Sequence, residues 1–402
     1  MPSVPFEDAE IPKEDLMRFQ ITQQLAKDTN VTVGYDPTVG IYLKAALDFQ
    51  IGDVVLEEMK EFICDLKDWN TKDDEIVNEL LPKYQTQSRQ PLMEVPYLRK
   101  QSLQLDRDSS LGLEKSEKFI SLLMLNAVGC DCCGLKLFPL ISKMMHSCSP
   151  NTFLVDKKDE FPVQIVATKP IKKGDLLTRT YITDDDLFWS LSIRKEFLFN
   201  FMHFICLCER CIILDPFDRF LCSCSGDICF NQFSLVEEKV DIIEEFECTK
   251  CHRVSDKSEL PLLLAVEMEN IAFRIKNKYE KQEYVNIIDG IPLMELIVKS
   301  SKKLGPRNFS TIVFMEAYVF YYFHKFNKPC QHVVKFVEQL LEYYAIVYYS
   351  VCPIAAASRT DELLEWCAIP SRHLKKLFPF YTLGDENAKN LDRWQRLIKH
   401  TS

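Results

Sequence analysis

Glycine is scarce in this chain, with 11 among 402 residues. Neither G-x-G-x-x-G nor G-x-x-x-x-G-K-[ST] occurs, which argues against the phosphate-binding loops of Rossmann and P-loop proteins. Basic charge is also in short supply, because the formal net charge is -10. That balance disfavours broad electrostatic binding to nucleic acid and suits a basic protein partner better.

Long hydrophobic segments are lacking as well. Residues 1–10 are acidic and contain no apolar core, so a secretory signal is not expected. The longest apolar stretches, such as residues 312–323, are too short and too aromatic to span a membrane. These observations predict an intracellular protein, in the cytoplasm, the nucleus or both, with no membrane association.

Cysteine, by contrast, is abundant: there are 16, and eight of them lie between Cys206 and Cys251. In a reducing compartment cysteines serve as metal ligands or buried thiols and not as disulfides. The run C-x-C-x-x-C at residues 206–211 lacks one ligand for a tetrahedral zinc site. Cys148, within M-H-S-C-S-P-N at residues 145–151, is the candidate for that ligand. The alternative for this heptapeptide is a Ser-Pro turn with an incidental cysteine.

A second group of cysteines follows the first. Cys248 and Cys251 form a C-x-x-C pair, and its separation of roughly 20 residues from three further cysteines is typical of zinc ribbons. We take Cys222 and Cys224 as the partners of this pair, although the spacing leaves Cys229 open as an alternative.

At 402 residues the chain is expected to contain two or three domains. Hydrophobic periodicity predicts strand-rich and helical parts in turn. The expected strands and helices of the N-terminal half are a helix over 14–26, strands over 31–35, 40–45 and 54–58, helical spacing over 60–127, strands within 128–182 and one helix over 183–199. From residue 258 onward the pattern is helical, in antiparallel pairs that suggest a tetratricopeptide-like array. The main helical segments there are 262–275, 292–304, 308–326, 331–349 and 360–366.

Three segments in this order resemble the SET-domain protein lysine methyltransferases, specifically the SET-and-MYND branch. Residues 145–151 are similar to the family pattern N-H-S-C-x-P-N, and residues 174–181 to G-E-E-[LV]-T-x-x-Y. The run at residues 206–211 resembles the post-SET cysteines, so the resemblance covers about residues 39–211 and, more loosely, the helical C-terminal part. It implies that the first two segments cross in a knot-like arrangement.

The resemblance implies an α+β fold: a SET-domain β core with a helical insertion, a post-SET zinc site and an all-α tetratricopeptide-like C-terminal domain. The expected parts are an N-terminal lead-in (1–30), a SET N-terminal β unit (31–60), a helical insertion at the MYND position without zinc ligands (61–127), the SET core (128–205), the post-SET and second cysteine-rich segment (206–257) and the helical domain (258–402).

The resemblance also implies ligands and site residues. The cofactor would be S-adenosylmethionine, the partner a protein with a basic, lysine-bearing segment, and the protein a monomer. Zn²⁺ would be held by Cys148, Cys206, Cys208 and Cys211. Tyr181 falls at the position of a tyrosine that orients the substrate amine, and packing in the core is its alternative role. The cofactor-binding positions would be Gly40, Asn126, His146 and Phe204.

Some positions depart from the family pattern. Met145 stands where the family has Asn, Met202 where it has a second channel tyrosine, and residues 37–41 keep only part of K-G-N-G-[LF]. Each lost hydrogen-bonding group is worth about 1–3 kcal/mol in a dry site. Two hypotheses follow: a lysine methyltransferase acting on histone or non-histone lysines, and an impaired SET-fold protein that binds a partner in transcriptional regulation.

Overall fold

The computed structural model describes most of the chain between residues 11 and 350. The described residues are 11–37, 39–59, 62–64, 126, 128–130, 134–155, 162–183, 185–202, 204–212, 219–234, 243–248, 250–255, 259–280, 293–325 and 331–350. The chain divides into two compact units: the first is Met1–Tyr181 with Arg396–Ser402, and the second is Ile182–Gln395.

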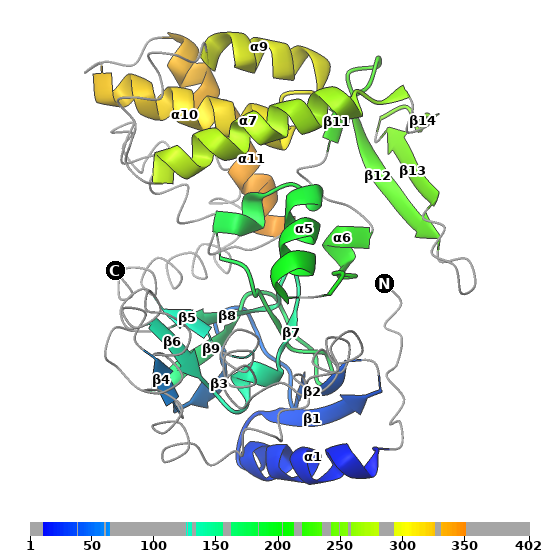
Figure 1. The fold of residues 1–402 in the computed structure, drawn as a ribbon, viewed down its shortest axis with the longest axis vertical. Helices are drawn as coiled ribbons and strands as arrows, with labels where there is room; N and C mark the ends of the chain where they lie inside the picture. The colour runs from blue at the N-terminus through cyan, green and yellow to red at the C-terminus, as the bar shows by residue number, and fades with distance from the viewer. Residues whose placement is uncertain are drawn as a thin grey trace, which may run out of the picture. The chain divides into compact units, whose positions relative to one another are not determined.

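The first unit begins with a helix and a β-hairpin. Helix α1 (Lys13–Ala26) lies beside strand β1 (Val31–Asp36), which pairs antiparallel with β2 (Gly40–Ala45) (Figure 1). The hydroxyl of Tyr35 donates a hydrogen bond of 2.9 Å to Asp15 and so joins the strand to the helix. The helix and both strands confirm the predictions from hydrophobic periodicity.

Two three-stranded sheets follow in the first unit. The first has the order β3 (Val54–Glu58), β9 (Val163–Ala167), β8 (Thr152–Val155), and the second has the order β4 (Phe62–Cys64), β6 (Gly134–Leu137), β5 (Val128–Cys130). The helical expectation for residues 60–127 is wrong at Phe62–Cys64, because these residues pair antiparallel with β6. The other residues of that predicted insertion, apart from Asn126, lie outside the described part of the chain.

The core of the first unit joins the β1–β2 hairpin to strands β3 and β9. Val55, Ile165 and Leu177 are fully buried in it together with Ile141 of the short 3-10 helix η3 (Ile141–Lys143). The carboxylate of Glu58 accepts the first two backbone N–H groups of this turn at 2.6 and 2.8 Å. It therefore caps the turn that leads into the M-H-S-C-S-P-N segment.

Two Gly-Asp turns of the first unit share the same hydrogen-bond pattern. In each turn the aspartate, Asp53 or Asp175, accepts the backbone N–H three residues earlier, at 2.7 and 2.8 Å. The turns are joined directly, because Phe49 and Ile171 exchange two backbone hydrogen bonds of 2.8 and 3.0 Å. A repeated sequence pattern thus becomes a pair of neighbouring turns.

The second unit opens with two short helices where one longer helix was expected. The prediction over residues 183–199 is wrong: a 3-10 helix, η4 (Asp185–Phe188), is followed by α5 (Leu191–Met202). Thr183 Oγ1 accepts a backbone N–H at 3.2 Å and begins the first helix, while Ser190 Oγ accepts another at 3.3 Å and begins the second. The break therefore arises from a second N-cap within the segment.

A four-stranded antiparallel sheet follows, which the cysteine spacing alone did not reveal. Its strands are β11 (Arg219–Leu221), β12 (Asp227–Ser234), β13 (Ile243–Cys248) and β14 (Val254–Ser255), in that order. Phe220 of β11 and Phe246 of β13 pack edge to face across β12, with ring centroids 6.4 Å apart. This small apolar contact, with buried Ile228, is the sheet's described core.

Helices form the remainder of the second unit. They are α7 (Leu262–Glu280), α9 (Leu293–Lys303), α10 (Phe309–Lys325) and α11 (Gln331–Ser350). Helix α10 contacts the other three and buries Phe314, Met315 and Val319 among them (Figure 1). Four of the five predicted helices are confirmed, and the fifth, over residues 360–366, lies outside the described part of the chain. Among described residues, no helix has the length and apolar character needed to cross a membrane.

Candidate active site and metal centres

The site is built on two short strands that are far apart in sequence. Strand β7 (Met145–His146) pairs in parallel with β10 (Thr178–Arg179), and the backbone N–H of Ser147 donates to the carbonyl of Arg179 at 3.0 Å. The two segments picked out in the sequence therefore lie side by side.

Asn151 stabilises the pairing of β7 with β10. Its Nδ2 donates to the carbonyl of Leu176 at 2.8 Å, and its Oδ1 accepts the backbone N–H of Thr178 at 2.8 Å. The hydroxyl of Thr178 lies between the two residues, 3.0 Å from Asn151 Oδ1 and 3.1 Å from Asn151 N. The side-chain amide of Asn151 thus satisfies backbone groups that the short β7–β10 ladder leaves unpaired.

His146 lies at the centre of the crossing. Its Nδ1 accepts the backbone N–H of Tyr181 at 3.0 Å, so the ring proton sits on Nε2. Nε2 is 3.3 Å from Cys148 Sγ, which places an N–H donor on that sulfur. One imidazole therefore links the predicted tyrosine to a predicted metal ligand.

Tyr181 packs against His146 of β7 and Arg179 of β10. Its ring centroid is 5.2 Å from that of His146, and its hydroxyl donates to the carbonyl of Met144 at 2.7 Å. The guanidinium of Arg179 lies 4.6 Å from the ring centroid, a cation–π distance. Burial raises the pKa of Tyr181, and the charge of Arg179 offsets only part of that rise, so the phenol is neutral at physiological pH.

The remaining residues predicted to bind a cofactor come from other parts of the chain. Gly40 begins β2 with a φ of 82°, a conformation that favours glycine, and open space lies where a Cβ would point. Asn126 is buried in the first unit. Phe204 follows α5 in the second unit, and its backbone N–H donates to Leu198 at 3.4 Å. The structure brings His146 and Tyr181 together, and a joint role of the other three stays a prediction.

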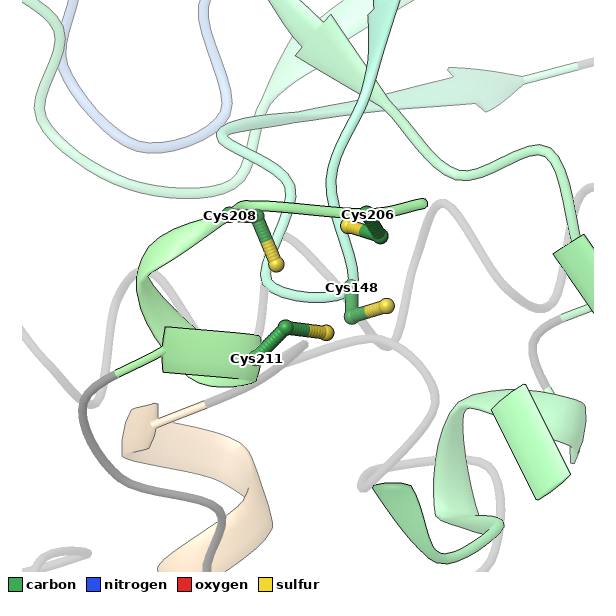
Figure 2. Close-up of side chains that lie close together, drawn as sticks. All are labelled: Cys148, Cys206, Cys208 and Cys211. Atoms are coloured by element: carbon green, nitrogen blue, oxygen red, sulfur yellow. The ribbon is translucent and has the colours of Figure 1, made fainter. Parts of the chain in front are cut away.

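Four cysteines gather into the first cysteine cluster. Each offers a sulfur, and the four sulfur atoms lie within 4.8 Å of one another: Cys148, Cys206, Cys208 and Cys211 (Figure 2). Cys211 comes from the short helix α6 (Glu209–Ile212), and three of the four are buried. Four soft sulfur donors at this spacing fit a tetrahedral Zn²⁺ ion.

One buried arginine lies close to one of these ligands, and a second buried arginine precedes that ligand in the chain. Arg194, which is 0% exposed, points Nη2 at Cys211 Sγ over 3.8 Å and donates through Nη1 to the carbonyl of Trp189. Arg210, 3% exposed, donates to Leu187 at 2.7 Å and to Trp189 at 3.4 Å. A zinc ion with four thiolates carries net negative charge, and burial of such a charge is favourable only when it is offset. The guanidinium group of Arg194 supplies part of that offset.

A second cysteine cluster lies on the four-stranded sheet. Its sulfur atoms also lie within 4.8 Å of one another, and its members are Cys222, Cys224, Cys248 and Cys251. The geometry of both clusters is able to hold a metal ion. The side chain of Cys229, the alternative from sequence, lies outside the described residues.

Several contributing residues escaped the prediction from sequence. Arg179, Arg194 and Arg210 carry no motif of their own. A hint was nonetheless present: Arg194 interrupts the apolar face of a helix, and Arg210 stands between two predicted ligands. Buried charges of this kind are rare unless they are paired.

Comparison with known proteins identifies the family of one segment of the chain. Residues 40–182 match the SET domain family model, and this segment contains Gly40, the β7–β10 crossing, His146 and Tyr181. These residues therefore form a SET domain.

Curated relatives are similar over short stretches. A SET and MYND domain-containing protein of Dictyostelium discoideum is 35% identical over 103 residues, which are 24% of this chain and 25% of that protein. A SET domain-containing protein of Drosophila melanogaster, SmydA-8 isoform B, is 39% identical over 75 residues, 19% of this chain and 16% of that protein. The chain thus spans about a quarter or less of the length of these relatives.

Solved structures show a weaker likeness. The SET domain of LSMT bound to lysine and AdoHcy has a TM-score of 0.31 and 12% identity, covering 90% of this chain and 93% of that chain. Rubisco LSMT bound to AdoMet has a TM-score of 0.29 and 13% identity, covering 92% of this chain and 100% of that chain. At these scores the likeness adds nothing to the assignment made from residues 40–182.

Proposed function

We propose that this protein is a SET-type, S-adenosylmethionine-dependent protein lysine methyltransferase of the SET-and-MYND branch. The observation that carries the proposal is the parallel pairing of β7 and β10 inside the segment that matches the SET domain. This pairing sets His146 and Tyr181 in direct contact, 35 positions apart in the chain.

The residues divide into cofactor-binding and amine-positioning roles. His146, Asn126, Gly40 and Phe204 would hold S-adenosylmethionine, which supplies the methyl group on its sulfonium sulfur. The open space at Gly40 fits the close approach of a ligand to the backbone, because a side chain there would occupy it.

Tyr181 would position the lysine amine. Its hydroxyl donates to the carbonyl of Met144, and a phenol oxygen that donates its proton can also accept from an amine N–H. Because burial raises its pKa, Tyr181 does not serve as a base, and its contribution is orientation of the nucleophile.

The first cysteine cluster would hold a structural Zn²⁺ ion. Cys148 lies in the crossing itself and its sulfur contacts His146 Nε2, so the metal would support the residue proposed to border the cofactor. The substrate would be a protein with a basic, lysine-bearing segment, bound by a monomeric enzyme.

A second function is favoured by two specific observations. Met145 occupies the first position of β7, where the family pattern has an amide, and Met202 ends α5, where that pattern has a second channel tyrosine. A SET-fold protein that has lost methyl transfer and binds a partner in transcriptional regulation would show both features.

Calorimetry with S-adenosylmethionine, followed by transfer of labelled methyl groups to histone and non-histone proteins, separates the two functions. The enzyme is expected to bind the cofactor and to transfer methyl groups, and Tyr181→Phe is expected to slow transfer by about 10- to 100-fold. Tyr35→Phe is the matched control, since Tyr35 bonds to Asp15 of α1 and should leave transfer unchanged. No detectable heat at high-micromolar cofactor would overturn the enzyme proposal and leave the binding module.

A further inference from the structure

We propose that the second cysteine cluster holds a Zn²⁺ ion of its own, which clamps the four-stranded sheet β11–β14 as a zinc ribbon. The proposal does not depend on methyl transfer. It rests on sulfur geometry, on two matching turns and on one glycine, all within the second unit.

The sulfur distances fit a single metal ion. Cys222 Sγ lies 3.7 Å from Cys251 Sγ, and Cys224 Sγ lies 3.4 Å from Cys248 Sγ. Zn–S bonds of about 2.3 Å in a tetrahedron place the sulfurs about 3.8 Å apart. A cluster with several irons would need wider spacing, because bridging sulfides separate its metal atoms.

The first ligand pair sits on a tight turn between β11 and β12. The backbone N–H of Cys222 donates to Gly226 at 2.9 Å, and the backbone N–H of Ser225 donates back to Cys222 at 2.9 Å. Ser225 has a φ of 62°, which is uncommon outside glycine and closes the turn. The turn directs Cys224 back toward β13, where its sulfur meets that of Cys248.

The second ligand pair sits on a similar turn between β13 and β14. The backbone N–H of His252 donates to Cys248 at 3.0 Å, and the backbone N–H of Cys248 donates to Arg253 at 3.0 Å. His252 has a φ of 57°, so this turn also closes through a left-handed residue. Two turns of the same construction thus present two cysteines each to one point.

A backbone donor lies at one of the ligands. The backbone N–H of Lys250 donates to Cys248 Sγ at 3.4 Å, and such a donor stabilises negative charge on the sulfur. A thiolate is the form of cysteine that binds a metal.

Gly226 is the strongest sign of a built site. A Cβ at this position would lie 2.8 Å from Cys248 Sγ and 3.2 Å from Cys224 Sγ, and also 2.6 Å from the Cβ of Lys250. The turn therefore leaves no room for a side chain, because the space is filled by two converging sulfurs.

Metal content of the full chain tests the proposal. Protein produced with supplemental zinc is expected to carry two Zn²⁺ ions by elemental analysis, and Cys224→Ser to carry one. Gly226→Ala keeps every cysteine but crowds the sulfurs, so it is expected to carry one ion as well. Ser225→Gly is the matched control beside it and should keep two. Cys229→Ser should also keep two.

Each outcome has a clear meaning. One ion in the wild type, with none lost in Cys224→Ser, would overturn the proposal, as would a mass that reveals two disulfides. Loss of an ion in Cys229→Ser would overturn the choice of ligands. Because the first cysteine cluster is counted in the same sample, a variant that merely unfolds is recognised by loss of both ions. Cobalt substitution in the Cys148→Ser background should give the absorption of a tetrahedral tetrathiolate from the second cluster alone, and its absence would contradict the proposed site.

Discussion

Each of the two cysteine clusters offers four cysteine sulfurs, but the clusters differ in burial and in the elements that supply the cysteines. The first draws Cys148 from one motif and its other members from residues 206–211; three of its four members are buried, and Arg194 lies beside Cys211. The second draws its ligands from two tight turns of one sheet, and Cys251 is exposed. Closing a longer loop removes more entropy from the unfolded chain, so the first ion should contribute more to stability. Exposure should make the second ion the easier one to remove.

Substitution of one ligand in each cluster should give the largest difference in stability between the two clusters. Cys211→Ser is expected to lower the free energy of unfolding by about 4 kcal/mol or more, since it leaves the buried cysteines without their metal and the buried Arg194 without its sulfur partner. Cys251→Ser is expected to cost about 1–2 kcal/mol, because only the sheet β11–β14 opens. Urea denaturation of both variants provides the comparison, and equal losses would remove the distinction between the clusters.

Arg194→Gln should affect the first cluster alone. Removal of the buried charge is expected to cost about 2–4 kcal/mol and to speed zinc release from that cluster at least tenfold. Chelator-driven release, followed with a zinc-sensitive dye, measures the rate. Glu196→Gln, on an exposed position of the same helix, is the control. An unchanged rate of zinc release from the first cluster would show that Arg194 has no role at Cys211.

Asn151→Ala should loosen the segment that carries Cys148. It removes the amide bonds to Leu176 and Thr178, and the expected cost is about 2–3 kcal/mol, because the backbone groups it satisfies are partly buried. The second cluster should keep its ion throughout. Hydrogen exchange of the Thr178 backbone N–H reports the change, and unaltered protection there would contradict the anchoring role.

Lys250→Ala should have the smallest effect. The exposed ammonium of Lys250 donates to the carbonyl of Cys224 at 3.2 Å, and exposed contacts of this type contribute about 0.5 kcal/mol or less. The backbone N–H that bonds to Cys248 is retained in this variant. Zinc affinity of the second cluster should therefore change by less than about threefold, and a large loss would mean that the lysine side chain and not the turn holds the site.

The sequence was most informative where residue type fixes chemistry. Cys148 could be joined to residues 206–211 from spacing and resemblance alone, and the structure groups them. The strands before residue 60 followed from alternation, while Phe62–Cys64 did not, since a three-residue strand is defined by its partner β6 and not by its own pattern. The break before α5 depended on Ser190 acting as a second cap, which competes with an otherwise helical sequence. Arginines that act only through burial, such as Arg194, leave no spacing to detect.

Cofactor binding by the wild type and two cysteine variants tests the proposed active site and the contrast between the clusters together. Calorimetry with S-adenosylmethionine is expected to show binding to the wild type and a loss of at least tenfold in Cys148→Ser, because His146 Nε2 loses its sulfur partner. Cys224→Ser, which removes only the second ion, is expected to bind like the wild type. No binding to the wild type, or an equal loss in Cys148→Ser and Cys224→Ser, would contradict a methyltransferase site supported by the first cluster.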